Sequence, residues 1–128
     1  MSVLGDDEGR IVSTPEPGAF AEEWAAAFNR RDIEAVLAHF QDNVVFTSPV
    51  AARVISGSGG VVRGKAALRE YWSAAAELMP ELHFDVLGVY QGQSVLVINY
   101  RNERGRLVSE VLEFEDGLVC RGHGTYLD

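Results

Sequence analysis

The order in which helical and strand patterns occur along the chain limits its fold more than any other feature of the sequence. Three short amphipathic helical patterns lie in the first 80 residues, and four long strand patterns joined by glycine turns fill the rest. Because no strand–helix–strand alternation follows the last helical pattern, the strands are expected to pair mainly as antiparallel hairpins in one sheet. The sequence therefore predicts an α+β fold, with three N-terminal helices packed on a curved, mainly antiparallel sheet to form a cone with an apolar pocket.

Composition favours a single domain and disfavours several classes of partner. The chain has 128 residues, 47% of them hydrophobic, which is enough for one core and too little for two domains. Its net charge of −8 repels phosphate backbones and anionic lipid surfaces, so we expect neither nucleic acid nor a membrane as a partner. One cysteine, no signal-peptide pattern and no apolar stretch of about 20 residues predict a cytoplasmic location.

The N-terminal residues differ from the rest of the chain. Residues 1–17 contain glycine, proline and acidic side chains without a sustained period, which is typical of a flexible leader. The domain itself is predicted to span residues 18–128.

Three apolar stripes with helical spacing follow the leader. The first covers about residues 18–29, the second about 33–41 with Asp32 as its N-cap, and the third begins after Gly64 and is halted by Pro80. The positions expected to be buried on these helices are Phe20, Trp24, Ala27 and Phe28, then Ile33, Val36, Leu37 and Phe40, then Leu68, Tyr71, Trp72 and Ala75.

Extended segments occupy the remaining parts of the domain. The stretch VVFTSPV indicates a strand stopped by Pro49, and residues 52–64 indicate a glycine-rich extended segment that forms an edge hairpin. The four closing strands are expected at about 81–91, 94–103, 106–115 and 118–127.

Alternation along these strands predicts which side chains face the helices. In the strand over 94–103 the bulky residues Leu96, Ile98 and Tyr100 share one side, which we take as the inner face. The matching side of the strand over 106–115 carries Val108, Glu110, Leu112 and Phe114. Glu110 is therefore a carboxylate in an otherwise apolar row, and it is the strongest candidate for a functional residue.

Several stretches of the sequence resemble a known superfamily. The segments WAAAFNRRDIEAVLAHFQDNVVFTSP, RGKAALREYW and SEVLEFEDGLV resemble the nuclear transport factor 2-like superfamily, in the bacterial branch that holds SnoaL-like polyketide cyclases and ketosteroid isomerases. The resemblance covers roughly residues 18–128. It implies a curved sheet wrapped around three helices, a deep apolar pocket at the open end and, commonly, a homodimer formed through the convex face.

The resemblance carries over only part of the ketosteroid isomerase chemistry. In those enzymes an Asp general base precedes a proline at the end of the first strand, where this chain has Ser48, and a hydroxyl cannot take an α-proton at neutral pH. The oxyanion-hole tyrosine aligns with Trp24 and a supporting tyrosine with Trp72, while the protonated Asp falls at or near Glu110. Steroid-type isomerisation is therefore not expected. The last Asp of the related limonene-epoxide hydrolases aligns near Gly124, so that chemistry also lacks a residue.

Two functions of different classes remain. The first is a SnoaL-like pocket protein for a small apolar molecule that acts as a cofactor-independent isomerase, cyclase or hydrolase, with Glu110 and Ser48 as catalytic candidates. The second is a noncatalytic ligand-binding or dimerisation module that has lost the catalytic Asp. In either case the predicted ligand-binding residues are Trp24, Phe28, Phe46, Trp72, Tyr100 and Leu112.

Other candidates have a structural interpretation beside the functional one. Glu110 is either a pocket acid with a raised pKa or the ion-pair partner of Arg101 or Arg121. His123 is a pocket base only if the last strand turns it inward, and alternation from Tyr126 turns it outward. Cys120 has no evident base beside it and is expected to be a small buried residue.

No metal or cofactor is expected. The histidines His39 and His83 have no ligand spacing with carboxylates. Gly59, Gly64 and Lys65 satisfy the GxxxxGK pattern of a phosphate-binding loop, but the next residue is Ala66 rather than the required Ser or Thr. These glycines are better explained by a hairpin and a helix start.

Overall fold

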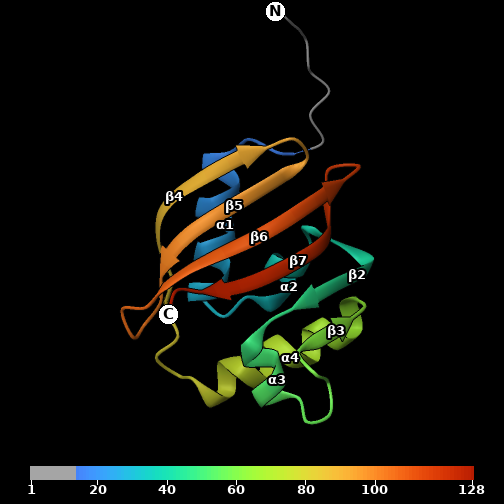
Figure 1. Ribbon diagram of the computed structural model, residues 1–128, viewed down its shortest axis with the longest axis vertical. Helices are drawn as coiled ribbons and strands as arrows, with labels where there is room; N and C mark the ends of the chain where they lie inside the picture. The colour runs from blue at the N-terminus through green and yellow to red at the C-terminus, as the bar shows by residue number, and fades with distance from the viewer. Residues whose placement is uncertain (1–13) are drawn as a thin grey trace, which may run out of the picture.

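One curved, open sheet of six strands forms a wall of the molecule (Figure 1). The structure is a computed structural model and describes residues 14–128. The strands are β2 (Phe40–Thr47), β3 (Val61–Arg63), β4 (Asp85–Gly92), β5 (Val95–Arg101), β6 (Leu107–Glu115) and β7 (Leu118–Tyr126). They follow the order β3-β2-β7-β6-β5-β4 across the sheet. All neighbours are antiparallel except β2 and β7, which are parallel.

The helices lie against this sheet and complete the cone. Within the described residues they are α1 (Pro17–Asn29), α2 (Ile33–Leu37), α3 (Pro49–Val54) and α4 (Lys65–Leu78). Helix α1 runs behind the strands β4 to β6, and α4 packs beside β2 and β3 (Figure 1). The α+β fold with helices on a curved, mainly antiparallel sheet is therefore confirmed, with one short helix more than the sequence predicts.

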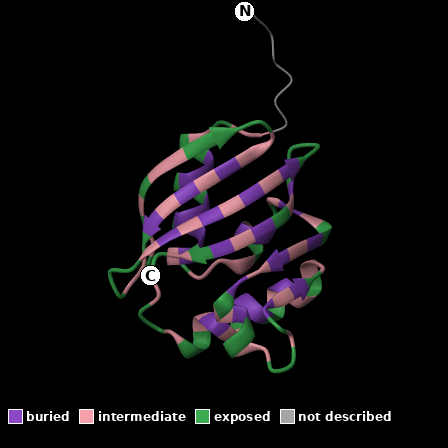
Figure 2. Ribbon diagram, in the orientation of Figure 1, coloured by how far each residue is buried: buried purple, intermediate pink, exposed green. Residues whose placement is uncertain are grey.

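Alternating burial along the central strands confirms the predicted inner face. In Figure 2 buried and partly buried residues alternate along β5 and β6. Leu96, Ile98 and Tyr100 of β5 are buried, and so are Val108, Glu110, Leu112 and Phe114 of β6. Because the side-chain period of a strand is two, this register places Glu110 inside the cone.

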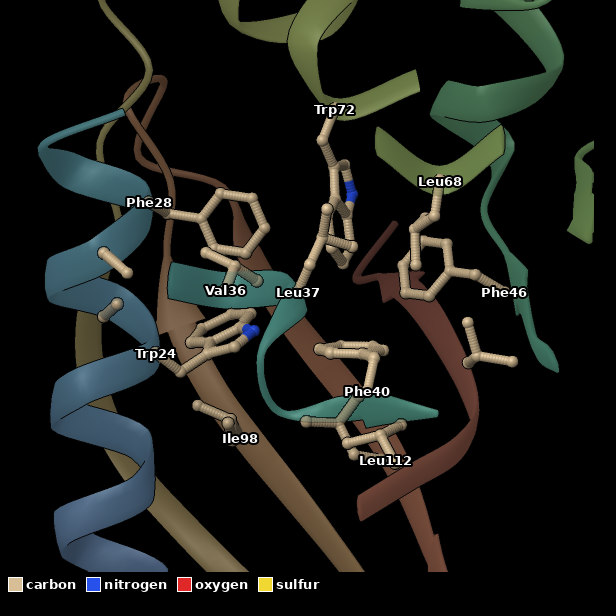
Figure 3. Packing of buried hydrophobic residues seen from close by; sticks show 14 of the residues in the cluster. Trp24, Phe28, Val36, Leu37, Phe40, Phe46, Leu68, Trp72, Ile98 and Leu112 are labelled. Atoms are coloured by element: carbon tan, nitrogen blue, oxygen red, sulfur yellow. The ribbon is translucent and has the colours of Figure 1, made fainter. Parts of the chain in front are cut away.

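Aromatic rings fill the space between the helices and the sheet (Figure 3). Trp24 packs edge-on against Phe28, with ring centroids 5.3 Å apart, and Phe28 packs edge-on against Trp72 at 5.0 Å. Trp72 in turn contacts Phe40 and Phe46 at 5.3 and 5.5 Å. Edge-to-face pairs are a favourable geometry for aromatic side chains, so this chain of rings fixes α1 and α4 relative to β2.

The second helix is shorter than predicted. It ends at Leu37 rather than near residue 41, and Phe40 belongs to strand β2. The Val119 amide donates to the His39 carbonyl at 2.8 Å, and Phe40 is paired with Val119 in the parallel ladder. Pairing with a strand distant in sequence therefore overrides the local helical period.

The segment after Pro49 is also corrected. Residues 49–54 form helix α3, where the sequence analysis expected a strand end and then an extended segment. Ser48 caps this helix, because its Oγ accepts a hydrogen bond from the Val50 amide at 3.1 Å, and Pro49 occupies the first helical turn. Only Val61–Arg63 forms the expected edge hairpin, as the antiparallel partner of β2.

Strand β4 begins at Asp85, several residues after the predicted start near residue 81. The preceding backbone is held by a side chain instead of a strand. Asn29 accepts from the Phe84 amide at 2.8 Å and donates to the Phe84 carbonyl at 3.0 Å. This pair of bonds satisfies the backbone polar groups that strand pairing would otherwise have satisfied.

The predicted leader, residues 1–17, falls mostly outside the described residues, which begin at Thr14. Its last residues take part in the domain. The Glu16 carboxylate accepts a hydrogen bond from the Ala19 amide at 2.7 Å and caps α1, which begins at Pro17.

The close contact between Gly122 and Phe46 gives a test of the packing. A Cβ added at Gly122 would lie 2.9 Å from Phe46 Cδ1 and 3.2 Å from Leu112 Cδ2. We expect Gly122→Ala to lower the free energy of unfolding by about 1–3 kcal/mol through overpacking, measured by urea denaturation. Gly88→Ala is the control, because a Cβ there has no neighbour within 4 Å. Equal stabilities of the two variants would contradict this packing.

Candidate functional site

A cavity of about 670 Å³ opens between helices α1, α3 and α4 and the inner face of the sheet. Five of the six predicted ligand-binding residues line it, namely Trp24, Phe28, Phe46, Trp72 and Tyr100. Leu112 does not line it. This side chain is fully buried in the core, close to Gly122. It lies two residues beyond Glu110 on β6, which places it about 6.6 Å further along the strand and away from the cavity.

Glu110 lies in the cavity wall and is almost completely buried, with 5% of its surface exposed. It is paired with Ile98 of β5 on one side and Gly124 of β7 on the other. Gly124 leaves space for the carboxyl, since a Cβ at that position would lie 3.7 Å from Glu110 Oε1. No cation of the described residues pairs with Glu110, so the alternative partners Arg101 and Arg121 are excluded.

The isolation of this carboxyl changes its acidity. Burial raises the pKa of Glu110 to about 8, and a hydrogen bond from the Tyr100 hydroxyl opposes the rise only in part. Near neutral pH the group is mostly protonated, with a minor ionised fraction. A carboxyl whose pKa lies this close to the ambient pH is able to donate a proton and to accept one.

Ser48 is the second buried polar residue of the site, with 5% of its surface exposed. Its Oγ would lie 3.3 Å from a Cβ on Gly124, so Ser48 and Glu110 approach the same glycine from opposite sides. The hydroxyl also interacts by hydrogen bonds with Tyr71 and Tyr126. The structure thus brings together both predicted catalytic candidates, although Ser48 already serves as the cap of α3.

Three tyrosines surround these two residues. Burial raises the pKa of the phenols of Tyr71, Tyr100 and Tyr126, so all three remain neutral hydrogen-bond donors at physiological pH. Of the three, Tyr100 alone is among the ligand-binding residues predicted from the sequence. Tyr71 lies on the predicted buried stripe of α4, and Tyr126 shares the inward parity of Gly124, so the same patterns could have identified both. We call Glu110, Ser48 and the three tyrosines the polar cluster.

Charged side chains surround the opening of the cavity, which departs from the apolar pocket expected from the sequence. The exposed or partly exposed lining residues with a charged or amide side chain are Arg53, Asn102, Glu103, Arg104, Arg106 and Asp128, which we call the mouth. Arg106 lies 3.7 Å from the Asp128 carboxylate and 5.1 Å from the centre of the Tyr126 ring. The cavity therefore has aromatic walls, a buried polar cluster and a charged mouth.

The other candidates lie outside the cavity. His123 is on the outer face of the sheet, where its Nδ1 is 2.7 Å from Thr47 Oγ1 and its Nε2 is 3.3 Å from Glu113 Oε2. The Cys120 thiol donates to the Glu113 carbonyl at 3.4 Å. Gly64 precedes α4 with a positive φ of 90°, and Lys65 lies 3.6 Å from Asp42, which agrees with a helix start at the GxxxxGK pattern.

Residues 14–128 contain no candidate metal site and no candidate membrane-spanning helix. No group of three or more His, Cys, Asp or Glu side chains in this part of the chain is arranged to hold a metal ion. None of the helices found there is long and apolar enough to cross a membrane.

Helices packed on a curved, open sheet of six strands match the cone fold of the nuclear transport factor 2-like class. The model of one family in this class, the SnoaL-like domain, matches residues 21–122. The chain belongs to the SnoaL-like domain family.

Solved structures agree with this assignment. A SnoaL-like protein of unknown function from Burkholderia thailandensis is 34% identical, with a TM-score of 0.80 over 88% of this chain and 95% of that chain. TerC, co-crystallised with polyporic acid, is 19% identical, with a TM-score of 0.71 over 88% and 92%. A proposed isomerase of the SnoaL-like family from Agrobacterium tumefaciens is 15% identical, with a TM-score of 0.69 over 88% and 97%. The last two show the fold alone, and no curated protein sequence matches the chain.

The raised pKa of Glu110 makes a prediction about stability. The pKa in the folded protein, about 8, is above the ordinary value of 4.5, so the unfolded chain releases this proton first as the pH rises. The stabilisation is fully present below about pH 4.5 and is lost towards pH 8, by up to about 1.4 kcal/mol per pH unit. Glu110→Gln should flatten this decline, measured by urea denaturation at several pH values.

The control for this measurement is Glu115→Gln, which removes an exposed acid from the end of the same strand. It should keep the decline of the parent protein. A parent whose stability rises steadily between pH 5 and pH 8 would contradict the buried, unpaired carboxyl.

Proposed function

We propose that this protein binds a small, largely apolar carbonyl compound in its cavity and isomerises or cyclises it without a cofactor, with Glu110 as the group that transfers the proton. One observation carries the proposal, namely a buried, unpaired carboxyl that faces a 670 Å³ cavity among neutral phenols. The aromatic walls supply apolar contact for the body of the ligand. The isomerase among the structural neighbours and the occupied crystal of TerC support a small-molecule site.

The proposed step needs no residue outside the polar cluster. The ionised fraction of Glu110 takes a proton from the carbon beside the substrate carbonyl, and the electron pair of that C–H bond moves to give an enolate. Hydroxyl groups of Tyr71 and Tyr126 donate hydrogen bonds to the enolate oxygen and stabilise its charge. Glu110 then returns a proton, either the one it took or one exchanged with solvent, to the same carbon or to another carbon of the enolate, so that no net proton or electron is gained or lost.

A Glu110→Gln variant tests the catalytic role. On a panel of β,γ-unsaturated ketones and aryl 1,3-diketones in D₂O, the parent should accelerate double-bond migration or deuterium uptake, measured by NMR. The rate should rise with pH and level off above about pH 8, as the carboxyl ionises. Glu110→Gln should lose about 10²-fold or more of the rate and keep ligand affinity, because the amide is nearly isosteric and cannot transfer a proton.

The matched control is Glu113→Gln, because Glu113 lies three residues from Glu110 on the same strand and on its outer face. It should keep the rate of the parent protein. An unchanged rate in Glu110→Gln, or a rate that falls as the pH rises, would contradict Glu110 as the base.

A noncatalytic binding module is the second candidate, and one observation favours it. The position that holds the Asp base in related isomerases is Ser48, and its hydroxyl is engaged in capping α3. On this interpretation the cavity holds its ligand unchanged, through the aromatic walls and the phenols. It predicts binding of the carbonyl panel with no effect of the protein on the rate.

Ser48→Asp distinguishes the two candidates. Aspartate also caps helices, so the variant should fold, and its carboxyl would lie near Glu110. If the cavity is a binding module that lacks only its base, Ser48→Asp should introduce proton exchange by about 10²-fold over the parent, measured by the same NMR assay. If Glu110 already supplies the base, the parent is active and this variant gains little.

The proposal also includes a homodimer, a cellular location and the classes of partner that are not expected. The homodimer would use the outer sheet face, where Val95, Val97 and Val111 are only partly buried in the single chain. The proposed cytoplasmic location rests on the single cysteine. The proposed lack of a nucleic-acid or membrane partner rests on the net charge of −8.

A further inference from the structure

The distribution of charge at the cavity contrasts with that of the whole chain. The protein carries a net charge of −8. Among the described mouth residues, however, three arginines outnumber the two acidic residues Glu103 and Asp128. The third acid of the cavity, Glu110, is mostly protonated near neutral pH because its pKa is raised. By side-chain charge, the mouth therefore holds one more cation than anions, in contrast to the acidic chain as a whole.

Two of the mouth arginines, Arg104 and Arg53, form no ion pair with a described carboxylate, and Arg53 is the one whose charge acts on the phenols of the cavity. It lies in the last turn of α3, is exposed, and lines the cavity. Within residues 14–128, no carboxylate forms an ion pair with it, whereas Arg106 is paired with Asp128 and Arg69 with Glu34. An arginine at this position costs little to desolvate partly and presents up to five donors in a planar fork.

The charge of Arg53 is directed towards the polar cluster. It acts on the hydroxyls of both Tyr71 and Tyr126 and favours their ionised forms. It has no corresponding influence on Glu110. Arg53, Tyr71, Tyr126 and Glu110 all line the same cavity, so one ligand can contact the cation, the phenols and the carboxyl.

We infer that the molecule held in the cavity is an organic acid, whose carboxylate is bound by Arg53 at the mouth while its apolar body lies against the aromatic wall that includes Phe46 and Trp72. This inference rests on the proposed function, because it assigns the substrate class of the same cavity. Carboxylate and guanidinium match in a bidentate geometry, which also fixes the direction in which the ligand enters. The carbonyl end of the molecule then faces the polar cluster.

The test compares aromatic acids with their amides, which have nearly the same shape and no charge. The probes are 2-naphthoate and 2-naphthamide, and 9-anthracenecarboxylate and its amide, titrated by calorimetry at pH 7. The parent protein should bind at least one acid about 10-fold more tightly than its amide, and this preference should shrink as the salt concentration rises. Arg53→Gln should remove the preference, and Arg53→Lys should restore part of it.

Arg63→Gln is the matched control, because Arg63 is exposed on β3, outside the cavity lining, and its removal makes the same change in net charge. This variant should retain the preference for the acid. Equal affinities for acid and amide in the parent, binding of no acid at all, or the same preference in Arg53→Gln would each overturn the inference.

These outcomes are separate from those that decide the proposed function. Preference for an acid is measured by binding, with no turnover required, and proton transfer is measured with neutral ketones that carry no carboxylate. If the amides bind as well as the acids while Glu110→Gln still loses turnover, only the organic acid is wrong. If the acid preference is present and Glu110→Gln has no effect on turnover, only the catalytic role is wrong.

Discussion

The burial of one carboxyl group determines the chemistry of the whole cavity. Glu110 is inside because β6 alternates strictly, and its neighbours Val108 and Leu112 must face the core. Turning the carboxyl outward would require a shift of register that exposes the entire apolar row. The hydrophobic stabilisation of the strand therefore offsets the cost of desolvating Glu110. This desolvation cost is reduced because the carboxyl stays protonated, and not because a cation pairs with it.

Small residues and hydroxyls make this arrangement possible. Gly124, opposite Glu110 in the ladder, leaves the space that the carboxyl and Ser48 share. Ser48 ends strand β2 and begins α3, so one residue both turns the chain and brings a hydroxyl to the cavity. Tyr71 comes from α4 and Tyr126 from β7, and each interacts with Ser48. The polar cluster is thus built from α4, β5, β6, β7 and the junction between β2 and α3, which only the tertiary fold brings together.

Local patterns in the sequence predict the inner face of the sheet well. They predict poorly where one element ends and the next begins. The row that contains Glu110 could be predicted because strand periodicity is enforced by burial on one face. Phe40 was assigned to a helix because its spacing from Val36 fits a helical stripe, whereas parallel pairing with β7 decides its conformation. Helix α3 is not predicted because Pro49 after a strand pattern indicates a strand stop, although Ser48 followed by proline is also a helix-start signal. Arg53 was missed with it.

The two ends of the cavity impose different requirements on one ligand. At the polar cluster, the favourable partner is a neutral oxygen or a carbon acid, because an anion there would face a carboxyl with no cation beside it. At the mouth, Arg53 favours an anion and is the residue through which a negatively charged molecule would approach a chain of net charge −8. A ligand with its negative charge at the buried end would face Glu110 with no cation beside it and would leave Arg53 without an anion. The electrostatics therefore select the orientation of the bound molecule as well as its class.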